Sequence, residues 1–537
     1  MSERGYADLH EHLKALEAAG LLITVERPIN KDTEMHPLVR WQFRGGIAER
    51  DRKAFLFTNV TDSKNRRYDI PVVVGALAAS REIYRIGMNC PLDKINDVWT
   101  RAIAQPIAPR VVQDAPCHEV EVAGLDHIPL PISTPGWDIA PYTTLSQYIT
   151  RDPETGVQNM GIYRGMLKAP KRLGMNPSLE LRPGIYTHWQ KARKRKERLA
   201  AAVVLGAPPC VAFTSAQKLP ETMDELHVAG GLAGAPINVV RARTVDLLVP
   251  AEAEIVVEGY IDTEYLEPEA PFGESHGHVN LQEYNAFMEV TCITRRRDAI
   301  LTSIISQVTP SESSLIKRVA LEPLYLQHLR QGLGIQGVKK VSMHEPLTNL
   351  RKVVVLVLER SMPRTEIWRA LYGAAAWNRA AGKYIIAVND DIDPDNADAL
   401  LWAMSYRANP ALDLEILRHR DQGHGPRSQR NGGEDASVLI DATLKENFPP
   451  ISLPKREYME RAREIWEELG LPPLKPEAPW FGYSLGDWPE ELDQAAALAV
   501  KGEYFQTGEK LVARRRKDVT MNTEVKRTGS GHSESDE

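Results

Sequence analysis

Two glutamates and one arginine are the residues of this sequence best suited to proton-transfer chemistry. Glu269 and Glu274 stand at the two ends of the segment Glu-Ala-Pro-Phe-Gly-Glu, and Arg164 closes an upstream Asn-Met-Gly-Ile-Tyr-Arg run. A nearby guanidinium favours the ionised form of a carboxyl group, whereas burial favours the protonated form. Two carboxylates that share one arginine can therefore differ in protonation state. One stays ionised while the other carries a proton, as general acid–base catalysis requires.

Taken alone, two glutamates at this spacing are more often solvated loop residues than catalytic groups. A second set of residues changes that balance. Asn159, His188 and Glu225 offer an amide oxygen, an imidazole nitrogen and a carboxylate oxygen, a mixture that suits Mn²⁺ or Mg²⁺ better than a structural zinc ion. Each of the three also has an ordinary interpretation, as a turn residue, a packed histidine or a helix-surface carboxylate. Only their combination with the glutamates predicts a metal site beside a proton-transfer network.

The elements that must position these residues fall into three regions. In the middle region, about 120–310, short β-rich runs are interrupted by Pro and Gly, which predicts a barrel or sandwich, and the run 253–261 leads directly into the Glu269 loop. Before this region, a helix at 9–22 and strands at 21–25 and 70–75 predict a small α/β lobe. After about residue 312, strands alternate with helices, which favours a parallel or mixed α/β lobe. Its strands are expected at 353–358 and 384–388, and its helices at 314–329, 364–381 and 397–408.

The C-terminal part of the sequence contains one amphipathic helix and two irregular segments. The helix is predicted at 454–469, and its apolar face packs either on the protein's own core, which we slightly favour, or on a partner subunit. The members of that face are Tyr458, Ala462, Ile465, Trp466 and Leu469. The segment 418–434 is expected to be a mobile loop. The polar, low-complexity C-terminus is expected to be disordered.

Bulk composition narrows the class of protein. A chain of 537 residues exceeds what one hydrophobic core supports, so two or three domains are expected. With 72 acidic and 66 basic residues the net charge is −6, which argues against nucleic-acid binding. The four cysteines form no CxxC pair and are expected to be free thiols in a reducing compartment. No signal segment or membrane span is expected, because no uncharged apolar run approaches the ~20 residues that cross a bilayer, and we predict a cytoplasmic protein.

Three other patterns are weaker. Gly332 to Gly337 matches GxGxxG but follows a predicted helix and precedes a strand, the reverse of a dinucleotide site. The alternating aspartates 391, 393 and 395 resemble the start of a calcium loop, yet Asn396 and Trp402 occupy its sixth and twelfth positions. The basic run Lys191–Arg198 is interpreted as a solvated helix face. The alternative is that it attracts an anionic substrate tail, such as a phosphate-bearing thioester.

Together these motifs resemble the UbiD family of decarboxylases, which use prenylated FMN. The resemblance runs from about Asp8 to Asp441 and depends on the order of several pieces, which are Leu16-Glu-Ala-Ala-Gly-Leu-Leu, the Glu225–Gly230 helix, Glu269–Glu274, Val388-Asn-Asp-Asp-Ile-Asp393 and Ile440-Asp-Ala-Thr. It implies a mixed α/β (α+β) fold with an N-terminal α/β lobe, a split β-barrel flavin-binding domain and a C-terminal α/β lobe with a terminal helix. The expected domains are 1–118, 119–312, 313–505 (including an oligomerisation helix) and a disordered tail at 506–537. The active site is expected between the flavin-binding domain and the C-terminal lobe.

The resemblance also assigns roles residue by residue. Glu274 would be the proton donor, Arg164 would orient the substrate carboxylate, and Glu269 would hold Arg164. The metal ligands would be Asn159, His188 and Glu225, which would bind Mn²⁺ (or Mg²⁺ or Fe²⁺) to grip the cofactor phosphate, with K⁺ nearby. The flavin itself would be lined by Ile162, Tyr163, Arg164, Thr187 and His188, and Lys383 would reach it from the C-terminal lobe.

The implied activity is the reversible, non-oxidative decarboxylation of an aromatic or heteroaromatic carboxylate, in which the cofactor acts as electron sink when CO₂ leaves. The partners implied are a flavin prenyltransferase, which supplies the cofactor, and further copies of the chain, from dimer to hexamer. This sequence has Ala270 where the family commonly has Gly, and the run Met166–Tyr186, which is rich in basic residues and continues into the basic helix, looks like an insert between Arg164 and His188. An aromatic acyl-CoA with a ring carboxylate is therefore a second substrate option. The alternatives to a decarboxylase are a flavin reductase on the same barrel, which would not need the glutamate pair, and a non-catalytic assembly subunit.

Overall fold

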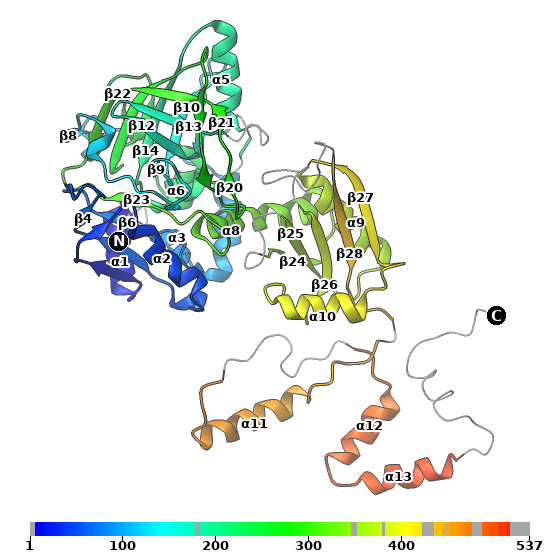
Figure 1. Cartoon of the computed structure of the whole chain (residues 1–537). Coiled ribbons are helices and arrows are strands. Elements are labelled where there is room, and N and C mark those ends of the chain that lie inside the picture. The colour runs from blue at the N-terminus through cyan, green and yellow to red at the C-terminus, as the bar shows by residue number, and fades with distance from the viewer. Residues whose placement is uncertain are drawn as a thin grey trace.

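The computed structural model describes residues 6–177, 183–217, 219–220, 222–344, 352–378, 382–421, 434–446, 448–474 and 486–515. They form a mixed α/β fold, as the sequence predicts, in which an N-terminal lobe and a large central β region lie together and a C-terminal α/β lobe stands beside them (Figure 1). Within the described part of the chain, no helix is long and apolar enough to cross a membrane.

The N-terminal lobe is built on a four-stranded sheet in the order β1-β3-β6-β23. Its strands are β1 (Leu22–Val25), β3 (Ala54–Phe57), β6 (Val72–Val74) and β23 (Leu301–Ser303). The helices are α1 (Leu9–Ala18), α2 (Met35–Arg44), α3 (Arg81–Met88) and α4 (Ile95–Ala104), and the small strands β2 (Ile29–Asn30), β4 (Val60–Thr61) and β5 (Arg67–Tyr68) form a separate sheet. Strand β23 returns from beyond the central region to pair with β6 in parallel, so the N-terminal and central regions share a sheet.

The central region is a nine-stranded antiparallel sheet that curls into a half-barrel (Figure 1). Its strand order is β11-β10-β14-β17-β22-β13-β12-β9, with β8 paired to β22. The strands are β8 (Val120–Glu121), β9 (Tyr142–Thr143), β10 (Gln147–Arg151), β11 (Gln158–Ile162), β12 (Gly165–Ala169), β13 (Arg172–Met175), β14 (Leu199–Leu205), β17 (Ile255–Ile261) and β22 (Phe287–Arg295). Around it lie α5 (Gly184–Arg195), α6 (Pro209–Thr214), α7 (Glu225–Ala233), a sheet of β7 (Arg110–Val111), β15 (Asn238–Arg241) and β16 (Leu248–Pro250), and two hairpins. The hairpins are β18 (Glu267–Glu269) with β21 (Glu283–Asn285), and β19 (Phe272–Gly273) with β20 (Val279–Asn280).

The run after Arg164, which looked like an insert, is part of this sheet. Strands β12 and β13 form an antiparallel hairpin, and β13 also pairs with β22. These residues therefore belong to the central sheet and are not a loop attached to it. The basic side chains of Lys168, Lys171 and Arg172 cluster at the hairpin turn and conceal the strand pattern in the sequence.

Helix α8 (Glu312–Gln327) connects the central region to the C-terminal lobe. It begins with a capping box in which Ser311 and Ser314 bond each other's backbone, and it runs on into a π-turn at His328–Gly332. The C-terminal sheet has the order β24-β25-β26-β28-β27, flanked by two helices. These elements are β24 (Val338–Met343), β25 (Val353–Leu358), α9 (Arg364–Trp377), β26 (Tyr384–Asn389), α10 (Ala397–Arg407), β27 (Leu414–Arg420) and β28 (Asp435–Asp441).

Two expectations about the C-terminal lobe need correction or restriction. The expected loop at 418–434 begins inside β27, which extends to Arg420, and residues 422–433 lie outside the described residues. Two aspartates of the calcium-loop pattern form ion pairs with arginines. Asp391 pairs with Arg407, and Asp395 pairs with Arg318.

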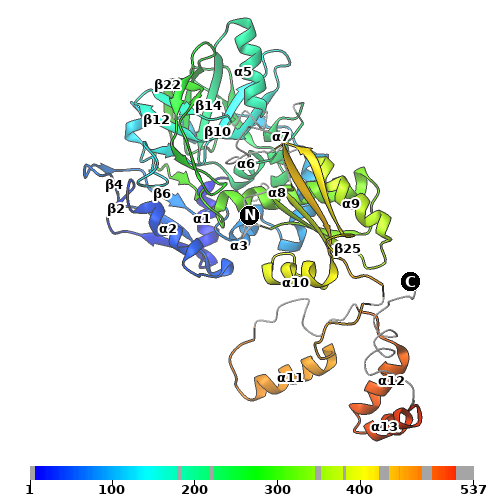
Figure 2. The same cartoon turned by 45° about the vertical axis from the view of Figure 1, so that its right-hand side comes forward.

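Three helices follow the C-terminal lobe and stand away from it, α11 (Arg456–Glu468), α12 (Glu490–Ala499) and α13 (Tyr504–Ala513) (Figure 2). None of them contains a buried residue. The expectation that the apolar face of 454–469 packs on the protein's own core is therefore wrong. The tail expected at 506–537 is helical at its start, where α13 extends to Ala513, and residues 516–537 lie outside the described residues.

Candidate active site

Arg164, Glu269 and Glu274 form one hydrogen-bonded network. Arg164 follows β11 at the edge of the half-barrel, and its Nε and Nη2 donate to Glu269 Oε1 and Oε2 at 2.9 and 2.6 Å. Its Nη1 donates to Glu274 Oε1. The Glu269 side chain is fully buried, and those of Arg164 and Glu274 are only 7% and 14% exposed. A bidentate arginine–carboxylate pair that is shielded from water is strong and fixed in geometry.

The electrostatics of this network keep the guanidinium charged. Burial alone would lower the pKa of Arg164, but the hydrogen bonds and charges of Glu269 and Glu274 outweigh burial and raise it. One cation thus faces two carboxylates. The guanidinium carbon of Arg164 also lies 5.0 Å from the centre of the Phe272 ring. The network therefore carries one more negative than positive group.

The loop between the two glutamates is fixed by its backbone. Ala270 has φ +75° and precedes a cis peptide bond to Pro271, and this left-handed conformation costs a non-glycine residue about 1–2 kcal/mol. A Cβ at Gly273 would lie 2.2 Å from Thr134 Oγ1, so only glycine fits there. Asp138 accepts hydrogen bonds from the backbone N–H groups of Gly273 (2.8 Å) and Thr134 (2.7 Å), which ties the loop to the preceding segment.

Asp138 is a site residue that the sequence analysis did not find. Burial raises its pKa to about 6, against the opposing effect of its backbone hydrogen bonds and of Arg164. Its partners are backbone groups, one of them 135 positions away. No local sequence pattern therefore predicts the contact between Asp138 and Gly273.

A cleft of about 110 Å³ opens in front of the network. Arg164 and Glu274 line it together with Ile162, Tyr163 and Phe272. The opposite lining comes from the segment after β23 and from α8, which contributes Ser313, Ile316 and Lys317. The cleft therefore lies at the junction of the central region with the connecting helix.

The predicted metal ligands Asn159 and Glu225 are in direct contact. Asn159 Nδ2 donates to Glu225 Oε1 at 2.9 Å, and the Met160 N–H donates to Glu225 Oε2 at 2.7 Å. Asn159 lies on β11, opposite Thr150 of β10, and Thr150 Oγ1 is 2.9 Å from His188 Nδ1. All three predicted ligands thus belong to one cluster at the end of the half-barrel.

Two helices begin at this cluster. Glu225 is the first residue of α7, and Gly184 is the first residue of α5. A Cβ on Gly184 would lie 2.5 Å from Asn159 Oδ1, so the start of α5 packs directly on the Asn159 side chain. The positive ends of helix dipoles favour anions such as phosphate.

Burial dominates the electrostatics of the cluster. It raises the pKa of Glu225 to about 8 and lowers the pKa of His188 to about 4, the latter against the charge of Asp152. Among the ion pairs of the described residues, none includes Glu225. The residues present therefore fit a hard divalent cation, since they supply oxygen and nitrogen donors around a buried carboxylate that has only neutral partners. No cluster of three or more His, Cys, Asp or Glu that could hold a metal occurs in the described part of the chain, and this set reaches three donors only through the Asn159 amide.

The other two residues predicted to line the flavin, Thr187 and Lys383, lie in different parts of the structure. Thr187 lies on α5 beside His188 and is half-buried. Lys383 precedes β26, where its ammonium lies 3.2 Å from Asp435 Oδ1. It is absent from the described lining of the cleft, so the structure does not bring Lys383 to Arg164.

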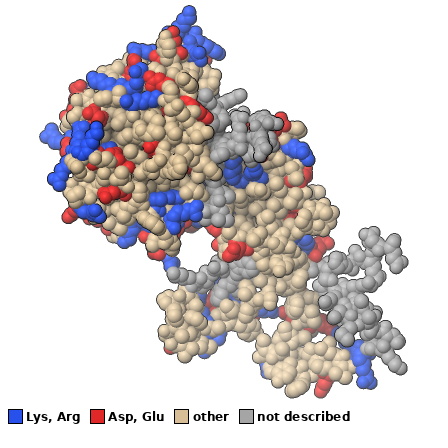
Figure 3. All heavy atoms as spheres, in the orientation of Figure 1, with Lys and Arg blue, Asp and Glu red and all other residues tan. Residues whose placement is uncertain are grey.

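Four of the nine described basic residues in the Lys168–Arg198 run pair with acids, and the basic residues at 193–196 are exposed on the surface. Lys168 bonds Glu267 at 2.8 Å, Lys191 bonds Asp152 at 2.7 Å, and Arg198 bonds Glu289 at 3.1 Å. On the face shown in Figure 3, basic and acidic side chains are interspersed rather than gathered in one basic patch. This arrangement favours the solvated-surface interpretation of the run.

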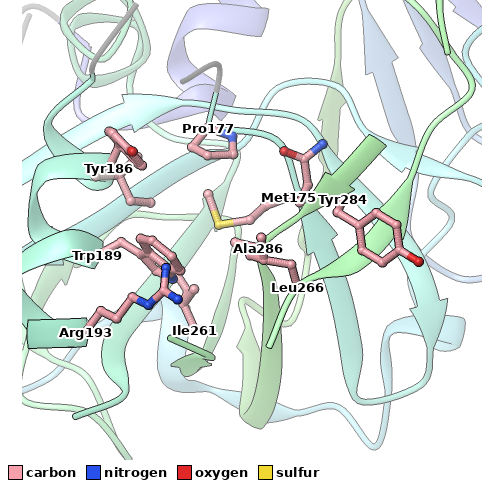
Figure 4. A pocket seen from close by; sticks show the side chains of 11 residues that line it. Met175, Pro177, Tyr186, Trp189, Arg193, Ile261, Leu266, Tyr284 and Ala286 are labelled. Carbon is pink, nitrogen blue, oxygen red and sulfur yellow. The ribbon is translucent and has the colours of Figure 1, made fainter. Parts of the chain in front are cut away.

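A second cavity, of about 180 Å³, lies behind the network and is mainly apolar (Figure 4). Trp189 and Arg193 of α5 line one side, and Met175 and Tyr284 contribute to the rest. Asn285 connects the two spaces, because it lines this cavity and its Nδ2 lies 3.4 Å from Glu269 Oε2. The cavity contains neither Arg164 nor Glu274, so the acid–base groups face the first cleft.

Comparisons with known proteins agree with this architecture. Three family models match the chain, described as the N-terminal domain (13–103), the Rift-related domain (110–308) and the C-terminal domain (315–442) of 3-octaprenyl-4-hydroxybenzoate carboxy-lyase. An uncharacterized protein of Aquifex aeolicus is 28% identical over 509 residues, which is 87% of this chain and 99% of that protein.

Solved structures place the fold in the same family. The UbiD-class enzyme HmfF from Pelotomaculum thermopropionicum, in complex with FMN, is 28% identical with a TM-score of 0.75 and covers 85% of this chain and 99% of its own. An evolved dimeric form of HmfF, in complex with prFMN, gives a TM-score of 0.72 at 28% identity over 84% of this chain and 97% of its own. The vanillic acid decarboxylase of Sedimentibacter hydroxybenzoicus, 22% identical, shares the fold with a TM-score of 0.73 over 87% of this chain and 99% of its own. The chain belongs to the UbiD family of carboxy-lyases.

Proposed function

We propose that this protein is a prenylated-FMN-dependent, reversible decarboxylase of an aromatic or heteroaromatic carboxylate. The observation that carries the proposal is the Arg164–Glu269–Glu274 network, which lies on the wall of a cleft also lined by Ile162 and Tyr163. Membership of a carboxy-lyase family and likeness to HmfF, whose structures hold prFMN and FMN, support it.

In this proposal each member of the network has one task. Glu269 binds Arg164 through two hydrogen bonds and holds the guanidinium toward the cleft. The substrate carboxylate competes with Glu274 for Arg164 Nη1. When Glu274 loses that contact beside a further negative charge, its protonated form becomes more favourable. Glu274 then carries the proton that replaces CO₂ on the substrate carbon, and the reverse reaction returns it.

Cofactor and metal are assigned to the neighbouring cluster. Asn159, His188 and Glu225 would hold Mn²⁺ (or Mg²⁺ or Fe²⁺), with K⁺ nearby, and the starts of α5 and α7 would favour the cofactor phosphate. Ile162, Tyr163 and Thr187 would lie along the flavin. The bound cofactor would supply an electron sink for the electron pair left behind by CO₂.

The partners follow from this assignment. A flavin prenyltransferase would supply the cofactor, and the exposed apolar residues of α11 to α13 suit assembly with further copies of the chain. Lys383 would approach the flavin only if the C-terminal lobe moved toward the central region. The aromatic acyl-CoA option remains a second substrate class, because the exposed cations Arg193, Lys194, Arg195 and Lys196 form no ion pair with the described acids.

The test uses protein co-expressed with a flavin prenyltransferase. The expected results are a prenylated-flavin absorption spectrum and CO₂ release from members of a panel of aromatic carboxylates. Glu274→Gln should keep the spectrum and lose about 10²–10⁴-fold in rate, the usual contribution of a general acid. A Glu274→Gln variant that remains fully active would remove this role from Glu274.

A flavin reductase on the same fold is the competing hypothesis. It predicts oxidation of a nicotinamide by the flavin-loaded protein and indifference to Glu274→Gln. Nicotinamide oxidation without CO₂ release from any member of the panel would replace the decarboxylase proposal.

A further inference from the structure

We propose that the apolar cavity behind the network is a second binding site, and that its ligand is a small aromatic carboxylate. Trp189 and Met175 form the wall that receives the ring, and Arg193 is the partner of the carboxylate. The proposed function assigns no role to these three residues, so this inference goes beyond that function and does not depend on it.

The size and the lining of the cavity fit one aromatic ring. Its volume is about 180 Å³, and a cavity of about 150 Å³ is enough to hold benzene. Met175 and Ile185 are buried and line the cavity together with Trp189. Figure 4 shows Met175 and Trp189 on adjoining sides of this space. Thioether and aromatic side chains both make favourable contacts with a flat ring, so the wall suits an aromatic ligand.

The Trp189 indole is held in place by the protein itself. Its Nε1 donates to Asp262 O at 2.8 Å. The Tyr186 ring, which also lines the cavity, stacks beside it with ring centres 6.2 Å apart and an interplanar angle of 13°. A wall that is ordered in advance loses little conformational entropy when a ligand binds. Trp189 therefore provides a fixed surface for the ring.

Arg193 supplies a cation where the cavity meets solvent. It lines the cavity, and its side chain is exposed. Its guanidinium carbon lies 5.2 Å from the centre of the Trp189 ring, and none of the ion pairs among the described residues includes Arg193. The neighbouring basic residues at 194–196 are also exposed, so the local potential favours anions. Because a guanidinium can bind a carboxylate through two parallel hydrogen bonds, Arg193 favours a carboxylate over a neutral ring.

Asn285 supplies a polar group on the inner side of the cavity. It lines the cavity, is only 5% exposed, and its Nδ2 lies 3.4 Å from Glu269 Oε2. No hydrogen bond among the described residues uses its Oδ1, although a side-chain amide can accept as well as donate. The cavity thus has a cation toward solvent, an apolar wall and a buried amide at its inner side. Apolar lining with a few converging polar groups is typical of a small-molecule site.

The first experiment locates the ligand. Crystals of the Glu274→Gln holoenzyme, in which turnover is slowed, are soaked with 4-bromobenzoate, and the anomalous signal of bromine gives its position. We expect bromine in the cavity between Met175 and Trp189, besides any signal in the Arg164 cleft. A bromine signal in the Arg164 cleft alone would overturn the second site.

The second experiment measures affinity by calorimetric titration of the same holoenzyme with benzoate. The protein should bind one more benzoate per chain than its Ala286→Leu variant, because the larger side chain fills the cavity that Ala286 lines. Arg193→Gln should raise the Kd of this site about fivefold, as expected for an ion pair at the surface. Lys194→Gln is the matched control and should bind as its parent does, since Lys194 is exposed but does not line the cavity.

A neutral probe tests the choice of a carboxylate. Benzyl alcohol should bind the cavity more weakly than benzoate, and Arg193→Gln should leave its Kd unchanged. Equal Kd values for the two probes would overturn the role of Arg193 as anion partner. If Ala286→Leu does not fold, the bromine position and the Arg193→Gln titration decide the matter. Failure of every carboxylate to release CO₂ would refute the proposed function but would change none of these binding results.

Discussion

Two carboxylates of this protein are almost equally buried but have opposite surroundings. Glu269 is fully buried and receives two hydrogen bonds from the charged Arg164. Glu225 is 2% exposed and accepts hydrogen bonds only from the neutral Asn159 side chain and Met160 N–H among its described partners. A buried anion needs a counter-charge. The network around Glu269 therefore carries its own cation, whereas the cluster around Glu225 is built to receive one.

This difference separates the two halves of the candidate active site. The Arg164 network can hold its geometry without any ligand, because its charges balance within the chain apart from one excess carboxylate. The negative charge of the Glu225 cluster is balanced only when a cation binds. Disruption of the Arg164 network should therefore destabilise the ligand-free protein. Disruption of the Glu225 cluster should change stability mainly when metal and cofactor are supplied.

The largest expected effect follows from Arg164→Ala. This change leaves Glu269 buried without a cation, and removing one partner of a buried ion pair typically lowers the free energy of unfolding by about 3–5 kcal/mol. Urea denaturation of the ligand-free protein measures it. Arg172→Ala is the matched control, because this arginine pairs with Glu267 at a partly exposed site. An Arg164→Ala variant that unfolds at the wild-type urea concentration would contradict the contrast between the two carboxylates.

A second prediction concerns the pH dependence of Asp138, which clamps the glutamate loop. Burial raises its pKa to about 6, against about 3.9 for an ordinary aspartate. Since the folded state holds the proton more tightly, the stabilising contribution is complete below about pH 4 and is lost as the pH rises through about 6. Asp138→Asn lacks this titration, so its stability relative to wild type should rise by up to about 3 kcal/mol between pH 4 and pH 7.

The measurement is urea denaturation of both proteins across that pH range. Asp126→Asn serves as control, because Asp126 is half exposed and lies in the N-terminal part of the central region, away from Gly273. A stability difference between wild type and Asp138→Asn that stays constant from pH 4 to pH 7 would show that Asp138 titrates as an ordinary aspartate.

The contrast between Asp138 and the glutamates also shows what the sequence could predict. Glu269 and Glu274 were found because they share one short motif, and the strand at Val353–Leu358 was predicted to the residue because six apolar residues stand in a row. Asp138 was missed because its partners are backbone N–H groups, which any residue could supply.

The errors have physical causes as well. Strands β12 and β13 were not predicted, because the charged residues of their turn dominate the local composition. The 454–469 helix was assigned to the core from its apolar face, but an apolar face does not say which surface covers it, and α11 contains no buried residue. Periodicity predicts that a helix forms more reliably than it predicts where the helix packs.

A third prediction tests the Glu225 cluster. Addition of Mn²⁺ and FMN should raise the melting temperature of wild type, because a ligand at 100 times its Kd stabilises the folded state by about 2.7 kcal/mol. Glu225→Gln should lose most of this ligand-dependent increase, since it removes the only carboxylate of the predicted metal set. Thermal melts with and without the two ligands, together with metal analysis of the purified protein, provide the measurement. Glu252→Gln, at a carboxylate that contacts Asn238 outside the cluster, should respond to the ligands as wild type does. An equal ligand-dependent increase in Glu225→Gln would place the metal elsewhere.

The smallest expected effect comes from Asn285, and it tests how completely Arg164 satisfies Glu269. The Asn285 contact with Glu269 Oε2 is long, at 3.4 Å, whereas Arg164 donates to the same oxygen at 2.6 Å. A neutral hydrogen bond at that distance contributes little beside a charge-assisted one. Asn285→Ala should therefore lower the free energy of unfolding by less than about 1 kcal/mol. It should also lower kcat/KM by about threefold or less. Urea denaturation and CO₂ release from the preferred carboxylate measure the two effects. If Asn285→Ala instead approached Arg164→Ala in either measurement, Glu269 would depend on neutral donors as Glu225 does, and the distinction between the two carboxylates would disappear.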